Sequence, residues 1–126
     1  MKITLNPNAA SDAQREAFIA EGGFGKHYTD HMVVCDWSQE SGWSEPELIP
    51  YGPLTLDPAT AVFHYGQEIF EGMKAYRQPD GSISLFRPEA NARRFARSAE
   101  RLALPQMPEE LFLETVHALV KQDAGW

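Results

Sequence analysis

Arg94 is the residue whose type and position best suit the binding of an anion. It lies in a segment with helical spacing of apolar residues, beside the apolar stripe and one position off a row of three arginines, Arg93, Arg97 and Arg101. A guanidinium offers a planar fork of N–H donors that matches phosphate oxygens. The alternative is a structural role, in which Arg94 covers the core with its aliphatic stem or pairs with Glu89 or Glu100. The residue types alone leave both interpretations open.

Two aromatic residues, Tyr65 and Phe70, are the candidates for an apolar pocket. They stand in the stretch FHYGQEIFEGMKAYR, residues 63–77, which also contains two glycines. Aromatic residues in such a stretch are usually core residues. A buried tyrosine hydroxyl needs a partner, however, and the mouth of a pocket supplies one.

Other chemistry is less well supported by the sequence. His31, His64 and Asp30 could be imagined as metal ligands, but no second pair at ligand spacing accompanies them, so we expect no metal site. Cys35 is expected in a strand, where burial raises the pKa of a thiol and disfavours a nucleophile.

Composition places the chain among globular proteins. Its 126 residues suffice for one domain with a core, and 43% are hydrophobic. The net charge of -7 disfavours nonspecific binding to nucleic acid or to an anionic membrane. A single cysteine suits a reducing compartment, and neither a membrane-length apolar run nor a secretory signal is visible, so we expect a cytoplasmic protein.

The first half of the chain is expected to be extended apart from one helix. Residues 1–23 predict an N-terminal arm, with a short helix capped by Ser11. Residues 24–37 alternate as a strand does. Residues 43–53 predict a strand broken by Pro46 and Pro50, at the edge of a sheet because proline cannot donate to a ladder.

The second half predicts a helix stop, a hairpin and two helices. Gly72 is expected to end a helix, because glycine enters the left-handed conformation without steric cost. Pro79-Asp80-Gly81 is typical of the turn of a hairpin. One helix should begin at Pro88 and a last one near Glu109. Strands followed by helices, without regular βαβ alternation, predict an α+β domain over residues 24–126.

Three blocks together carry a resemblance to a known family. They are FGKHYTDHMVVCDW from Phe24, HYGQEIFEGMKAY from His64, and LFRPEANARRFARSAERLALP from Leu85. In this order and spacing the chain resembles the N-terminal small domain of the branched-chain amino acid aminotransferases, which are pyridoxal 5'-phosphate (PLP) enzymes of fold type IV. The resemblance implies an antiparallel sheet packed with helices, and a homodimer.

The resemblance also implies roles for individual residues. In the FRPxxNxxR pattern the last arginine holds the cofactor phosphate, and counting from Phe86 gives Arg94. Arg87 and Arg93 are then structural or surface residues. Tyr65 and Phe70 would line the pocket for the substrate side chain, and Phe24 would close it. Such a pocket suits leucine, isoleucine or valine, and 2-oxoglutarate would accept the amino group.

One requirement of the family is missing from the chain. Transamination needs a lysine that binds the aldehyde of the cofactor and moves protons. None of the four lysines stands at the family's position for it: Lys2, Lys26, Lys74 and Lys121. We therefore expect a fragment that is inactive by itself and contains no catalytic residue.

Two other hypotheses about function remain beside the branched-chain aminotransferase. Within fold type IV, D-amino acid aminotransferase and aminodeoxychorismate lyase are the alternatives. A free-standing α+β module that binds anions through the arginine-rich helix is the alternative of a different class.

Overall fold

The computed structural model describes all 126 residues, and they cluster into two compact units. Unit 1 contains residues 1–52 and 115–126, and unit 2 contains residues 53–114. Helix α4, Glu109–Gln122, contributes its beginning to unit 2 and its end to unit 1.

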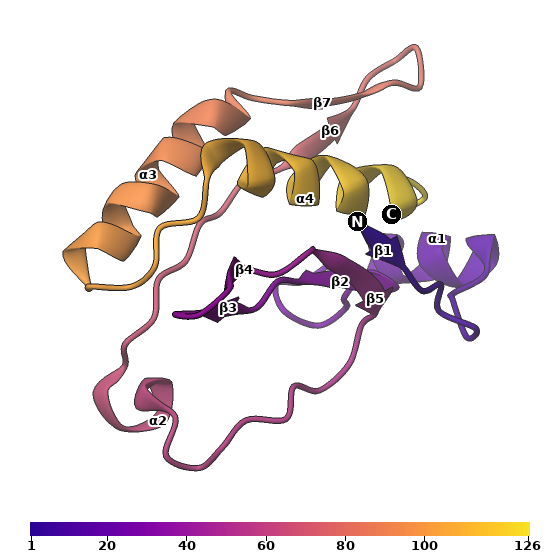
Figure 1. The fold of residues 1–126 in the computed structure, drawn as a ribbon. Coiled ribbons are helices and arrows are strands. Elements are labelled where there is room, and N and C mark those ends of the chain that lie inside the picture. The colour runs from indigo at the N-terminus through magenta and orange to yellow at the C-terminus, as the bar shows by residue number, and fades with distance from the viewer. The chain divides into compact units, whose positions relative to one another are not determined.

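Unit 1 is built on a three-stranded sheet with the order β1-β5-β2 (Figure 1). The strands are β1 (Lys2–Ile3), β5 (Glu47–Pro50) and β2 (His31–Val34). β5 pairs antiparallel to β2, with Val33 opposite Leu48, and parallel to β1. Leu48 is almost fully buried and anchors the core of this unit. A separate ladder joins β3, Trp37–Ser38, to β4, Gly42–Trp43.

The prediction of an edge strand over residues 43–53 was wrong. β5 is the central strand of its sheet, because its two prolines stand at positions where no ladder N–H is needed. Pro46 precedes the strand and uses its carbonyl, which accepts from the N–H of Lys2 at 3.1 Å. Pro50 is the last residue, opposite His31. The residues between them keep their donors.

The first residues of the chain belong to this same sheet through β1. Helix α1, Asp12–Glu21, follows with the expected cap, in which the Ser11 side chain accepts from the N–H of Gln14. Gly22 ends the helix with a φ of 63°. The division into an arm, 1–23, and a domain, 24–126, remains a prediction, although the contacts of β1 join the arm to the sheet.

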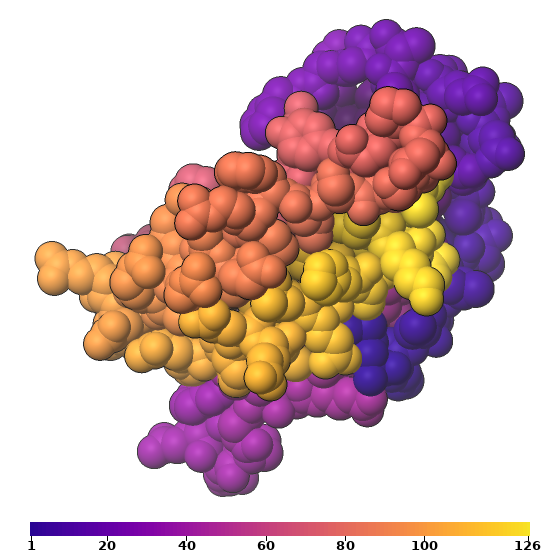
Figure 2. All heavy atoms as spheres, turned by 90° about the horizontal axis from the view of Figure 1, so that it is seen from above, coloured from indigo at the N-terminus to yellow at the C-terminus, as the bar shows by residue number.

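Unit 2 contains a hairpin and a long helix on which the beginning of α4 packs. Strands β6, Ala75–Arg77, and β7, Ile83–Leu85, pair antiparallel as expected, and Gly81 takes a φ of 83° in the turn. Helix α3, Pro88–Arg101, begins at the proline that the sequence indicated. Its alanines Ala92 and Ala99 are buried. The ring of Phe95 lies 5.3 Å from that of Phe112, and α3 lies beside the beginning of α4 in both views (Figure 1, Figure 2).

The prediction that Gly72 stops a helix was also wrong. The only helix in this stretch is α2, Ala61–Tyr65, and it ends at Gly66, which adopts the left-handed conformation with a φ of 58°. Residues 66–74 form no regular element. This irregular segment is bonded to α3 through Glu71 and Gly72.

The class of the fold is α+β, as the sequence predicted. Its ladders are antiparallel except for the pair of β1 with β5. No helix has the length and apolar character required to cross a membrane.

Candidate functional site

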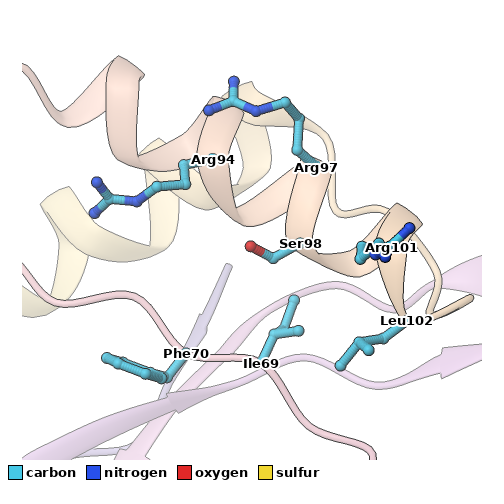
Figure 3. A pocket seen from close by; sticks show the side chains of 7 residues that line it. All are labelled: Ile69, Phe70, Arg94, Arg97, Ser98, Arg101 and Leu102. Carbon is cyan, nitrogen blue, oxygen red and sulfur yellow. The ribbon is translucent and has the colours of Figure 1, made fainter.

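The site of interest is a hollow of about 410 Å³ within unit 2 (Figure 3). One side is α3 and the other is the irregular segment around Phe70. Its lining combines three arginines, one hydroxyl and three apolar side chains: Arg94, Arg97, Arg101, Ser98, Ile69, Phe70 and Leu102. The hollow therefore offers positive charge beside an apolar surface.

Arg94 is held in this hollow by a carboxylate from the irregular segment. Its Nε lies 2.5 Å from Oε1 of Glu71, and its Nη2 lies 2.7 Å from Oε2. This is a side-on, bidentate pairing, which fixes the plane of the guanidinium. The partner is neither Glu89 nor Glu100, which were the two glutamates considered from the sequence.

Asn91 completes the cluster from one turn earlier on α3. Its Nδ2 donates to Oε2 of Glu71 at 2.8 Å and to the carbonyl of Gly72 at 3.1 Å. Asn91 and Arg94 are three residues apart, so they share a face of the helix. Together they tie the irregular segment to α3 at one point.

The electrostatics of the pair follow from this geometry. Hydrogen bonds from Arg94 lower the pKa of the Glu71 carboxyl below its ordinary value, against the opposing effect of burial, and Asn91 adds to the lowering. The same pairing raises the pKa of Arg94. Both groups are therefore charged at neutral pH.

Two of the four residues expected in a substrate and cofactor site line the hollow of unit 2. Arg94 and Phe70 line the same hollow, and the ring of Phe70 is 88% exposed. Tyr65, on α2, is also exposed but does not line the hollow. Phe24 belongs to unit 1 and is fully exposed. The roles of these four residues remain predictions.

Arg87 and Arg93, which the resemblance made structural or surface residues, lie outside the hollow. Arg93 makes an exposed ion pair with Glu109, with 3.6 Å between Nη1 and Oε2. Arg87 precedes α3 in the left-handed conformation, with a φ of 50°.

The TDHM block of unit 1, residues 29–32, is the centre of a hydrogen-bond network. Both oxygens of Asp30 accept, one from the N–H of Ala10 at 2.8 Å and one from Nε1 of Trp126 at 2.8 Å. The buried ring of His31 lies with Nδ1 2.6 Å from Asp123, while its Nε2 is 2.9 Å from the N–H of Asn6. Because a backbone N–H only donates, Nε2 accepts and the ring proton is on Nδ1.

The histidines considered as metal ligands thus have protein partners. The ring of His64 lies 2.7 Å from the carbonyl of Pro58. No group of three or more His, Cys, Asp or Glu side chains gathers to hold a metal ion. The thiol of Cys35 donates to the carbonyl of Ser44 at 3.2 Å.

Glu71 and Asn91 are the residues of the Arg94 cluster that sequence reasoning missed. A signal for Asn91 was present, since it precedes Arg94 by three positions and therefore shares its helix face. Glu71 gave no comparable signal, because it lies 23 residues away from its partner in the sequence.

Comparison with known proteins bears on this arrangement. No family model matches the chain. The branched-chain-amino-acid aminotransferase of Mycolicibacterium smegmatis is 56% identical over 124 residues, which are 98% of this chain and 34% of that protein. A probable enzyme of the same name from Streptomyces coelicolor is 54% identical over 98% of the chain, and the mitochondrial one of Saccharomyces cerevisiae is 43% identical over 98%.

The chain matches the N-terminal third of branched-chain-amino-acid aminotransferases. It spans about a third of the length of these curated relatives, 34% and 35% for the first two. The similarity to these aminotransferases covers both units, since it extends over nearly the whole chain. It agrees with the resemblance noted from the three sequence blocks.

Proposed function

We propose that this chain is the N-terminal part of a PLP-dependent branched-chain amino acid aminotransferase of fold type IV. The full-length enzyme would transfer the amino group of leucine, isoleucine or valine to 2-oxoglutarate. The observation that carries the proposal is the shared hollow of Arg94 and Phe70, which joins an exposed guanidinium to an apolar ring. Relatives named as branched-chain aminotransferases support the same conclusion.

The donors of Arg94 fit the phosphate of the cofactor. A guanidinium has five N–H donors, and the pairing with Glu71 engages Nε and one hydrogen of Nη2. The remaining donors include both hydrogens of Nη1 and are available to an anion, since the Arg94 side chain is 58% exposed. In the proposed enzyme Arg94 binds the phosphate and orients the cofactor.

Bound PLP supplies the carbonyl that takes up an amino group and the electron sink that the transfer needs. This chain would contribute binding surfaces to that chemistry. Phe70 offers an apolar wall, with Tyr65 and Phe24 as further expected walls, and burial of each methylene of a branched side chain contributes about 0.8 kcal/mol. No lysine of this chain has the expected place for proton transfer, so we assign no catalytic residue here.

The exposed aromatic side chains also support the proposed homodimer. Five aromatic side chains of unit 2 are exposed: Phe63, Tyr65, Phe70, Tyr76 and Phe86. Apolar surface of this kind favours association. Light scattering of the full-length enzyme should give the mass of a dimer, and a monomer at all concentrations would remove this part of the proposal.

The test of the proposed function is a panel of amino donors with the full-length enzyme. We expect turnover with L-leucine, L-isoleucine and L-valine, with 2-oxoglutarate as acceptor, and none with D-alanine. Activity with D-alanine, or release of pyruvate from aminodeoxychorismate, would instead favour the alternatives within fold type IV. Reduction with borohydride followed by mass spectrometry should find cofactor on none of Lys2, Lys26, Lys74 and Lys121.

A further inference from the structure

The pairing of Glu71 with Arg94 leaves one edge of the guanidinium unused. Glu71 takes the side edge, formed by Nε and Nη2. The end edge, formed by Nη1 and the outer hydrogen of Nη2, makes no contact with Glu71. A guanidinium can therefore bind this carboxylate and a second anion at the same time, in one plane.

Glu71 and Arg94 differ in exposure, so that one partner is buried and the other faces solvent. The Glu71 side chain is 6% exposed, whereas the Arg94 side chain is 58% exposed. The carboxylate is thus the fixed inner partner and the guanidinium is the outer one. In Figure 3 the Arg94 side chain extends from α3 on the side of the helix where the Phe70 ring lies, while Arg97 turns away from it.

Glu71 is itself held in place from α3. The amide of Asn91 donates to Oε2 of Glu71 and to the carbonyl of Gly72, so it fixes both the side chain and the backbone beside it. This clamp restrains a segment that has no regular secondary structure. Holding a long side chain in one rotamer before a ligand arrives reduces the entropy lost on binding.

We propose that Glu71, clamped by Asn91, is a positioning residue that orients Arg94 so that its end edge meets the phosphate of the cofactor. The inference rests on the proposed function, because it assumes that PLP is the ligand. It distinguishes Arg94 from Arg97 and Arg101, which line the same hollow without such a carboxylate partner. Glu71 touches neither phosphate nor substrate in this role.

A positioning role makes a prediction that depends on the phosphate group. In the full-length apoenzyme, Glu71→Gln keeps the shape of the side chain but loses the charge that holds the guanidinium. We expect the dissociation constant of PLP to rise about tenfold, and that of pyridoxal, which lacks the phosphate, to change by less than about twofold. Both constants can be measured by absorbance titration of the cofactor.

The matched control is Glu68→Gln, the same change three residues earlier on the segment. Glu68 is exposed and does not line the hollow, so neither constant should change. In an Arg94→Ala background, Glu71→Gln should have no further effect on PLP, since the group that it orients is gone.

Each other outcome overturns a stated part of the inference. If Glu71→Gln weakens PLP and pyridoxal equally, Glu71 is only structural, and if it tightens PLP, Glu71 competes with the phosphate. If Arg94→Ala itself leaves PLP affinity unchanged, the phosphate site of the proposed function is wrong. If Glu71→Gln does not fold, Asn91→Ala replaces it: a smaller, phosphate-dependent rise supports positioning, and no rise overturns it.

Discussion

The two units use their most distinctive residues in opposite ways. In unit 1, both side-chain oxygens of Asp30 and both ring nitrogens of His31 are engaged by other parts of the same unit. In unit 2, Arg94 is anchored on one edge only, and Tyr65 and Phe70 are exposed. The Asp30 and His31 side chains of unit 1 are thus fully engaged within that unit, whereas unit 2 leaves one edge of the Arg94 guanidinium available. Exposed aromatic rings occur in both units, since Phe24 of unit 1 is fully exposed.

The difference separates motifs that maintain the fold from motifs that bind. The TDHM block connects the first residues, the sheet and the end of α4, and it leaves no polar side-chain atom of Asp30 or His31 for a ligand. The FEG and FRPxxNxxR blocks meet at Glu71, Asn91 and Arg94, beside a hollow. Variants of Asp30 and His31 should therefore alter stability alone, and variants of Arg94 and Glu71 should alter cofactor binding.

The largest expected effect is the loss of stability when His31 is removed from the hydrogen-bond network of unit 1. His31→Ala removes the ring partner of Oδ1 of the buried Asp123 carboxylate and the acceptor of the Asn6 N–H, while Oδ2 of Asp123 keeps the backbone N–H of residue 31. Leaving Oδ1 of Asp123 and the N–H of Asn6 without these partners should lower the free energy of unfolding by about 3 kcal/mol or more. Urea unfolding of the full-length enzyme measures this loss.

The control for that variant is His117→Ala, at an exposed position of α4. It should change stability by less than about 0.5 kcal/mol. If His31→Ala were equally neutral, or if it weakened PLP binding in protein that is still folded, the separation between the two units would be wrong.

A smaller effect is expected at Trp126, which belongs to the same hydrogen-bond network. Trp126→Phe keeps a ring to stack on Phe18, 6.0 Å away, but removes the N–H that donates to Asp30. The loss of one hydrogen bond to a carboxylate should cost about 1.5–3 kcal/mol, at the lower end because Asp30 keeps its other partner. Trp37→Phe, at an exposed tryptophan, is the control and should be near neutral by thermal unfolding.

The smallest effect concerns the pH dependence of stability in unit 2. Because Arg94 lowers the pKa of Glu71 below 4.5 in the folded state, the stability contributed by the charged carboxylate is present above that pH. It is lost as the pH falls through the lowered value. The difference in unfolding free energy between the native enzyme and Glu71→Gln should therefore shrink between about pH 5 and about pH 3. A constant difference would contradict the ion pair.

Local features of the fold could be predicted from the sequence, and long-range ones could not. The cap at Ser11, the turn before Gly81 and the start of α3 at Pro88 depend on a few neighbouring residues, and all three were confirmed. The central place of β5 depends on β1, some 45 residues earlier, since Lys2 pairs with Glu47. That contact has no sequence signal.

The residues of the candidate site also divide into those that the sequence predicted and one that it could not. Arg94 and Phe70 were selected by their type and by the resemblance, and the structure places both at one hollow. The partner of Arg94 was missed, because the choice among glutamates depends on how an irregular segment folds back on α3. Local reasoning favoured Glu89 and Glu100, which are near in sequence, over Glu71.

The central claim is that Arg94 binds the cofactor phosphate, and one comparison of variants tests it most directly. The dissociation constant of PLP should be measured for Arg94→Ala and for Arg93→Ala in the full-length enzyme. Loss of charge-assisted bonds should raise it about ten- to hundredfold for Arg94→Ala, and Arg94→Lys should recover only part, since an ammonium lacks the fork. Arg93 makes only an exposed ion pair with Glu109, so its variant should bind PLP as the native enzyme does. Equal retention of PLP by both alanine variants would contradict the account.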